Sequence, residues 1–171
     1  ALQQRNALLR REGRQADTTT LDVLDDRLAG LGGAVLARRL ATAELVTPSL
    51  EQLYAELGEV PAALSFQYVA AGLGEMPRVA SADELAELLA SAVAAARRSD
   101  LERRTTTIGP HRDDVEIVLD SRDARTRASQ GEQRSVALGL RIAAYRVIAE
   151  RRGTAPVLLL DDVFSELDAR R

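Results

Sequence analysis

The sequence predicts an α/β chain with a mainly helical arm or lid over residues 1–104 and a strand-containing part over 105–171. Apolar residues recur at helical spacing through most of the first part. In the second, the apolar run Val157–Leu160 lies between a proline and two acids, as in a strand buried on both faces of a parallel sheet. A capped helix begins upstream of it at Ser129. The alternative, in which the helices are packing layers of one domain, stays open.

Composition narrows the classes of function. All 23 basic residues are arginine, so no phosphate-binding loop of the GxxxxGK[ST] form exists in the chain. The net charge of −3 and the 3% of aromatic residues favour neither a global attraction to DNA nor base-stacking. Without cysteine, disulfides, cysteine-bound zinc and thiol catalysis are excluded, which fits a cytoplasmic protein. No apolar run approaches the ~20 residues of a membrane span.

The first residues predict helices. Ala1–Arg14 is a short helical stretch with four arginines, and residues 18–46 carry a helix-packing seam. The seam consists of Leu21, Leu24, Leu28, Leu31 and Val35. Gly30, Gly32 and Gly33 either weaken this helix or permit the close approach of another.

Further elements complete the first part. Pro48, following a threonine, predicts that a new helix begins there and runs to about Leu57. Alternating apolar residues over Leu64–Ala70 predict a half-buried strand. Ser81, with Glu84 three residues later, predicts a helix that begins with a capping box.

The pattern changes after residue 104. Thr105–Ile108 and Val115–Leu119 resemble two strands around the turn Gly109–Asp114. This turn contains the single histidine, His111, followed by two acids. A metal site would need more ligands than the loop contains, so a tight turn with Arg112 paired to a carboxylate is favoured.

Two features of the second part carry chemistry. Ser129 and Gly131 open a helix whose free N–H groups and dipole favour an anion such as phosphate. Asp161 and Asp162 follow the apolar run, where ligands collect at the carboxyl ends of parallel strands, and their carboxylates suit Mg²⁺. Alone, each feature has an ordinary explanation, a capped helix or a pair of solvated acids. Together, in this order and separation, they favour a nucleotide site.

The motifs TTTIGPHRDD, ASQGEQRS and LLLDDVFSELD closely resemble those of the RecF family of SMC-like, ABC-type ATPases. The resemblance is strong over about Thr105–Arg171 and weak before it. It implies the signature helix and Walker B strand of an ABC-type ATPase head, joined to a mainly helical arm or lid domain. The Walker A part expected upstream is absent, so we expect a fragment that neither hydrolyses ATP nor binds it tightly by itself.

The resemblance implies roles for individual residues. Asp161 would position Mg²⁺, and Asp162 would orient the attacking water, which makes them the catalytic pair. Ser165 and Asp168 would belong to the D-loop at a dimer interface. The γ-phosphate of ATP held by a second subunit would bind the signature residues Ser129, Gln130, Gly131, Glu132 and Gln133. For Gln133 and its neighbour Arg134, a solvated first helical turn is an equal alternative.

At the level of function, the resemblance implies an ATP-dependent DNA-binding protein of replication, repair and the SOS response to DNA damage. It would be a weak, DNA-stimulated ATPase that dimerises on ATP and binds duplex DNA near single-stranded gaps. With RecO and RecR it would help to load RecA. The rivals are another SMC-like repair ATPase, a transporter subunit and a non-enzymatic helical interaction fragment.

Arginines near the signature motif are candidates for contact with DNA phosphates, although pairing with neighbouring acids is favoured. These residues are Arg122, Arg125 and Arg127. The arginines of the first helical stretch, Arg5, Arg10, Arg11 and Arg14, are weighed in the same way.

Overall fold

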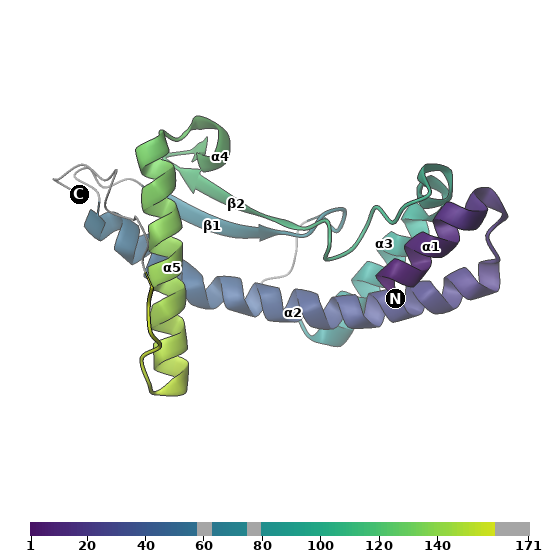
Figure 1. Ribbon diagram of the computed structural model, residues 1–171, viewed down its shortest axis with the longest axis horizontal. Coiled ribbons are helices and arrows are strands. Elements are labelled where there is room, and N and C mark those ends of the chain that lie inside the picture. The colour runs from purple at the N-terminus through teal and green to yellow at the C-terminus, as the bar shows by residue number, and fades with distance from the viewer. Residues whose placement is uncertain (58–62, 75–79, 160–171) are drawn as a thin grey trace. The chain divides into compact units, whose positions relative to one another are not determined.

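The computed structural model describes residues 1–57, 63–74 and 80–159 (Figure 1). The chain forms two compact units. The first unit consists of Ala1–Leu40 and Tyr68–Asp114. The second consists of Ala41–Gln67 and Val115–Arg171, of which residues 58–62 and 160–171 lie outside the described ranges. The chain therefore passes between the units three times, whereas the sequence suggested one boundary near residue 104.

Helices dominate the first unit. They are α1 (Leu2–Glu12), the 3-10 turn η1 (Gly13–Gln15), α3 (Ala82–Arg103) and the first part of α2 (Thr18–Leu57). One apolar cluster joins α2 to α3 through Leu28, Leu36, Leu85, Leu89 and Val93, together with Ala29 and Ala70. A second cluster joins α1 to the start of α2 through Leu8, Leu9, Ala16, Leu21 and Leu24. The seam predicted in residues 18–46 is therefore partly core, although Leu31 is 64% exposed and Val35 40%.

Two glycines let α3 approach α2 closely. A Cβ atom on Gly33 would lie 2.6 Å from the backbone nitrogen of Ala86 and would also collide with the carbonyl oxygen of Ala82. A Cβ on Gly32 would collide with the side chain of Leu89. The close approach of another helix, one of the two roles predicted for these glycines, is confirmed.

The structure overturns the helix start predicted at Pro48, because α2 continues through the proline as one helix of 40 residues. Pro48 has no N–H to donate to the preceding turn, which ordinarily costs about 3 kcal/mol in a helix interior. Beside it, the Thr47 hydroxyl donates to the carbonyl oxygen of Ala43 at 2.7 Å. The turns after the proline bury Leu50, Leu53 and Tyr54. This burial of apolar area offsets the cost of the proline.

A small sheet has the strand order β1-β2-β3, with β1 at Leu64–Val69, β2 at Asp114–Leu119 and β3 at Arg122–Asp123. β2 and β3 are antiparallel, with Val118 opposite Asp123. The predicted strands Leu64–Ala70 and Val115–Leu119 are confirmed.

Thr105–Ile108 is not a strand, contrary to the prediction. The backbone N–H groups of Thr105, Thr106 and Thr107 are bonded to residues of nearby helices instead of to a neighbouring strand. Thr106 donates its N–H to the side chain of Asn6 at 2.8 Å, and Thr107 donates to the side chain of Asp100 at 2.9 Å. These partners come from α1 and α3, and sequence alternation gives no sign of them.

The second unit contains α4 (Ala124–Arg127) and α5 (Gln130–Arg152), which Gly153 ends in a left-handed conformation. Its core combines the end of α2, the sheet and α5. The buried members are Leu50, Leu53, Tyr54, Leu64, Leu119, Ala124, Val136 and Ala143. None of the helices in the described ranges is long and apolar enough to cross a bilayer.

The buried strand expected from Val157 is not formed over residues 157–159. Val157 and Leu159 are each 86% exposed and Leu158 is 39% exposed. A strand buried on both faces needs neighbours to bond with, and none of the strands in the described ranges pairs with these residues. Leu160 lies outside the described residues.

Candidate nucleotide-binding site at the start of α5

Ser129 caps α5 with a complete capping box. Its hydroxyl oxygen accepts the backbone N–H of Glu132 at 3.2 Å, and the Glu132 carboxylate accepts the backbone N–H of Ser129 at 2.7 Å. The Ser81–Glu84 box at the start of α3 has the same pattern, with distances of 3.1 and 2.7 Å. The Ser81 box was predicted, whereas the carboxylate of the Ser129 box was missed although the same Ser-x-x-Glu spacing marks it.

Three donors remain available at this helix start. In the part of the chain that the structure describes, the backbone N–H groups of Gln130 and Gly131 have no acceptor, as expected for the first helical turn. The Ser129 hydroxyl accepts a hydrogen bond but donates none within the same ranges, which leaves its proton free. Together with the positive end of the dipole of a 23-residue helix, these donors suit a phosphate.

Gln133 ties the segment before Ser129 to α5. Its side-chain amide donates to the carbonyl oxygens of Ala124 at 3.3 Å, Arg125 at 3.2 Å and Ala128 at 3.2 Å. These bonds hold the short helix α4 and the residue before Ser129 against the first turn of α5. Sequence reasoning offered for Gln133 either a phosphate contact or a solvated turn. The observed contacts are different from both. They were not predicted because hydrogen bonds from a glutamine side chain to nearby carbonyl oxygens have no sequence pattern of their own.

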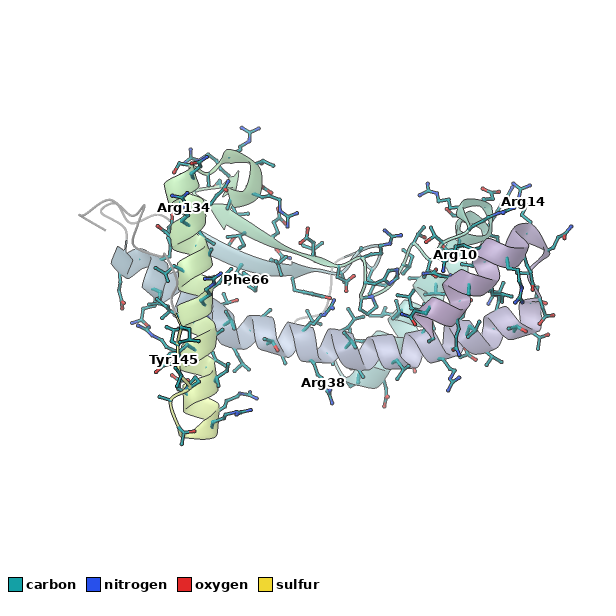
Figure 2. All side chains as sticks on the ribbon, viewed as in Figure 1. Arg10, Arg14, Arg38, Phe66, Arg134 and Tyr145 are labelled. Carbon is teal, nitrogen blue, oxygen red and sulfur yellow. The ribbon has the colours of Figure 1, made fainter. Side chains whose placement is uncertain are left out.

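Asp123 sets the start of α4. Its carboxylate accepts the backbone N–H of Thr126 at 2.8 Å and the Thr126 hydroxyl at 3.0 Å. The Thr126 backbone bond, followed by the bond from its hydroxyl, holds the pKa of Asp123 below its ordinary value. The capped turn places Arg125 and Arg127 on the segment that leads directly into Ser129, with Arg134 on the first turns of α5 (Figure 2).

The structure brings together only part of the predicted site. The five signature residues lie at one helix start. The three arginines of the preceding segment, Arg122, Arg125 and Arg127, are each exposed. The predicted acids and D-loop residues lie outside the described residues: Asp161, Asp162, Ser165 and Asp168. In the described ranges no cluster of three or more histidine, cysteine or acidic side chains is arranged to hold a metal ion.

The loop Gly109–Asp114 belongs to the first unit, where it is part of the packing. The side chains of His111 and Arg112 both lie within hydrogen-bond distance of the carbonyl oxygen of Thr106, His111 at 3.2 Å and Arg112 at 3.3 Å. Asp113 accepts the backbone N–H of Ala71 at 2.9 Å. The predicted pairing of Arg112 with a carboxylate is therefore wrong, because the nearby carbonyl oxygen takes that place.

Arg5 is removed from the candidates for phosphate contact, because it is fully buried. Its guanidinium donates to Asp25 at 2.5 Å, to Asp100 at 2.8 Å and to the hydroxyl of Thr106 at 2.8 Å. The two carboxylates neutralise a charge that would be costly to bury alone. Arg5 therefore holds α1, α2 and α3 of the first unit together.

Known proteins resemble the chain over nearly all of its length, although no family model matches it. The DNA replication and repair protein RecF of Arthrobacter sp. (strain FB24) is 39% identical over 199 aligned residues, which cover 99% of this chain and 49% of that protein. RecF of Myxococcus xanthus (strain DK1622) is 41% identical over 174 residues, covering 100% of this chain and 45% of that protein. The chain thus spans about half the length of the curated relatives it matches.

Solved structures agree with this relationship. Two structures of the recombination mediator protein RecF in the RecFOR pathway, one with ATPrS and one with ATP, superpose with TM-scores of 0.87 and 0.84. Their sequences are 31% and 32% identical to this chain, and each match covers 98% of this chain and 44% of the other. The likeness confirms the predicted fold class, part of an ABC-type ATPase head with a mainly helical part. The chain belongs to the RecF family.

Proposed function

We propose that the chain is part of an ATP-dependent DNA replication and repair protein, in which the start of α5 binds the γ-phosphate of ATP held by a second copy. The observation that carries the proposal is the set of donors on Ser129, Gln130 and Gly131 that have no acceptor within the described part of the chain. The names of the relatives and the ATP-bound RecF structures support it. Asp161 and Asp162 would serve the ATP held by their own copy through Mg²⁺ and water, as their resemblance to the Walker B motif implies.

In this proposal ATP acts as a switch. A phosphate bridging two copies favours the dimer, and hydrolysis removes the bridge. The dimer would bind duplex DNA near single-stranded gaps and act with RecO and RecR to help load RecA. The name of the RecFOR pathway in the related structures supports these partners. Ser165 and Asp168 would lie at the dimer interface.

The test uses the full-length protein and two matched substitutions. Ser129→Ala and Ser81→Ala each remove the serine of a capping box with the same bond pattern. Each should lower the free energy of unfolding by about 1 kcal/mol, because a helix cap is lost. Only Ser129→Ala also removes a hydrogen bond to a phosphate, so it should weaken ATP-dependent dimerisation roughly 10- to 100-fold.

Sedimentation velocity with and without MgATP measures the dimer, and binding to gapped duplex DNA is followed in parallel. A dimer weakened by Ser129→Ala and not by Ser81→Ala supports the proposal. Equal dimerisation of all three proteins, or a wild-type protein whose oligomeric state and DNA affinity ignore ATP, would reject it. The second result would favour the alternative of a non-enzymatic helical interaction protein.

A further inference from the structure

Exposed arginines gather at one end of the first unit, where α1 and α3 both finish beside η1. Figure 2 shows Arg10 and Arg14 at this end. All members come from the last turns of the two helices or from the turns that follow. We call them the arginine patch: Arg10, Arg11, Arg14, Arg98, Arg103 and Arg104, each of them exposed.

Contacts across the turn show that this is one surface. Arg14 forms an ion pair with Glu102 at 2.9 Å, and Arg98 approaches the same carboxylate at 3.7 Å. The Arg104 guanidinium packs beside Gly13, because a Cβ atom added to this glycine would lie 3.2 Å from the Arg104 Nε atom. The arginines of α3 therefore lie next to those of α1 and η1.

Positive charge exceeds negative charge within the patch. The acids that pair with its arginines are Glu12, bound to Arg11 at 2.6 Å, and Glu102, bound to Arg14 at 2.9 Å. In the ranges that the structure describes, Arg10, Arg103 and Arg104 have no ion-pair partner. The paired arginines keep most of their surface in water, since the Arg14 side chain is 76% exposed and that of Arg98 is 92% exposed.

Helix dipoles explain only a part of this charge. A helix C-terminus carries about half a negative charge, which one or two nearby cations offset. Arg10 and Arg11 lie in the last turn of α1, and Arg103 lies in the last turn of α3. Arg14 and Arg98 lie outside these last turns, so the excess exceeds what the two helix ends require.

The surroundings indicate what kind of partner fits. None of the large hydrophobic side chains found exposed in the described ranges comes from residues 1–17 or 94–114. A protein partner would be expected to meet an apolar centre with aromatic residues. The segments 1–17 and 97–104 contain no aromatic residue on which an unpaired base would stack. Exposed guanidinium groups without apolar or aromatic neighbours suit the phosphate backbone of a duplex.

We propose that the arginine patch binds the sugar-phosphate backbone of duplex DNA, independently of base sequence. The inference rests on the proposed function, since it places a DNA contact of that protein on the first unit, whereas the start of α5 belongs to the second. The patch adds affinity through the release of counterions, so its contribution decreases as salt increases.

The experiment compares two triple variants of the full-length protein with the same change in charge. The patch variant carries Arg10→Gln, Arg103→Gln and Arg104→Asn, the asparagine being suited to the left-handed backbone of residue 104. The control variant carries Arg141→Gln, Arg151→Gln and Arg152→Gln, three exposed arginines of α5. Binding of duplex DNA of mixed sequence is measured with MgATP at several salt concentrations, and circular dichroism verifies folding.

The patch variant should bind at least about tenfold more weakly, and the slope of log affinity against log salt should decrease by about 2 to 3, at ~0.9 per phosphate contact. The control should match the wild type. If folding of the triple variant is impaired, the pair Arg10→Gln and Arg103→Gln should still lower the slope by about 2. If the patch variant binds duplex DNA like the wild type, or if both variants lose affinity equally, the arginine patch is rejected as a DNA contact and the proposed function is left intact. Failure of the wild type to bind duplex DNA overturns the proposed function itself.

Discussion

Asp113 shows how hydrogen bonds stabilise a buried carboxylate in the first unit. Its side chain is 1% exposed, and it accepts hydrogen bonds from the Tyr68 hydroxyl and from the backbone N–H of Ala71. Arg39 donates to the Tyr68 oxygen at 3.1 Å and lies 3.9 Å from the carboxylate of Asp113. The side chains of His111, Arg112 and Asp113 are thus all in contact with other residues of the first unit.

The phenol of Tyr68 should titrate late. Burial, and secondarily its neighbour Asp113, raises its pKa from 10.0 to about 12. Because the folded-state pKa is the higher one, the stabilisation is present below pH 10 and is lost as the pH rises from about 10 to about 12. An absorbance titration of phenolate in the wild type and in Tyr68→Phe should differ by one group with a midpoint near 12. A difference with its midpoint at 10 would contradict this reading.

At the candidate site, sequence predicted that Ser129 caps α5 and that the first turn has free N–H groups, because capping depends on neighbours within one turn. The bonds from Gln133 to three carbonyl oxygens were not predictable. They depend on where α4 lies, and a helix of four residues has too little periodicity to be recognised. The burial of Arg5 was missed for a related reason, since its partners Asp25 and Asp100 are remote in sequence.

Among the helices, a boundary set by neighbouring residues was predicted correctly, whereas one that depends on packing against distant residues was not. The Ser81 capping box begins α3 at the predicted residue because the box is a local bond pattern. The continuation of α2 through Pro48 depends on the apolar side chains that it buries in the second unit. A rule that considers only the effect of proline on the backbone therefore predicted a helix start at Pro48 that the structure does not contain.

The contact between α2 and α3 provides a test with an internal control. Gly33→Ala places a methyl group 2.6 Å from the Ala86 backbone nitrogen, so the helices must separate at a cost of about 1–3 kcal/mol. Gly30 is exposed on the same helix and its Cβ position has no atom within 4 Å, so Gly30→Ala should stabilise by about 1 kcal/mol through helix propensity. Urea unfolding measures both. Equal effects of the two substitutions would show that helix propensity, not packing, governs this segment.

On the scale of the whole molecule, the two units have separate apolar cores. A substitution that destabilises one core should therefore affect only the unit that contains it. Leu89→Ala in the first and Leu53→Ala in the second each remove a buried side chain, at a cost of about 2–5 kcal/mol. Hydrogen exchange read by mass spectrometry should accelerate in α3 for Leu89→Ala and in α5 for Leu53→Ala. Acceleration of both helices by either substitution would mean that the cores unfold as one.

Sequence patterns predicted a mainly helical first part, but the division into units was beyond them. Apolar periodicity identifies a helix and its buried face without identifying the partner of that face. Thus Leu28 and Leu53 lie on the same helix, and only the structure shows that they serve different cores.

The threefold passage of the chain between the units has a consequence for synthesis on the ribosome. The first unit is complete only when Asp114 has emerged, after the segment Ala41–Gln67 of the other unit. When Asp114 emerges, Leu50 and Leu53 of the second unit have already been made, whereas their core neighbours Leu119 and Val136 have not. The nascent chain therefore carries an uncovered apolar helix end until these neighbours have been made, and a chaperone would matter most before that point.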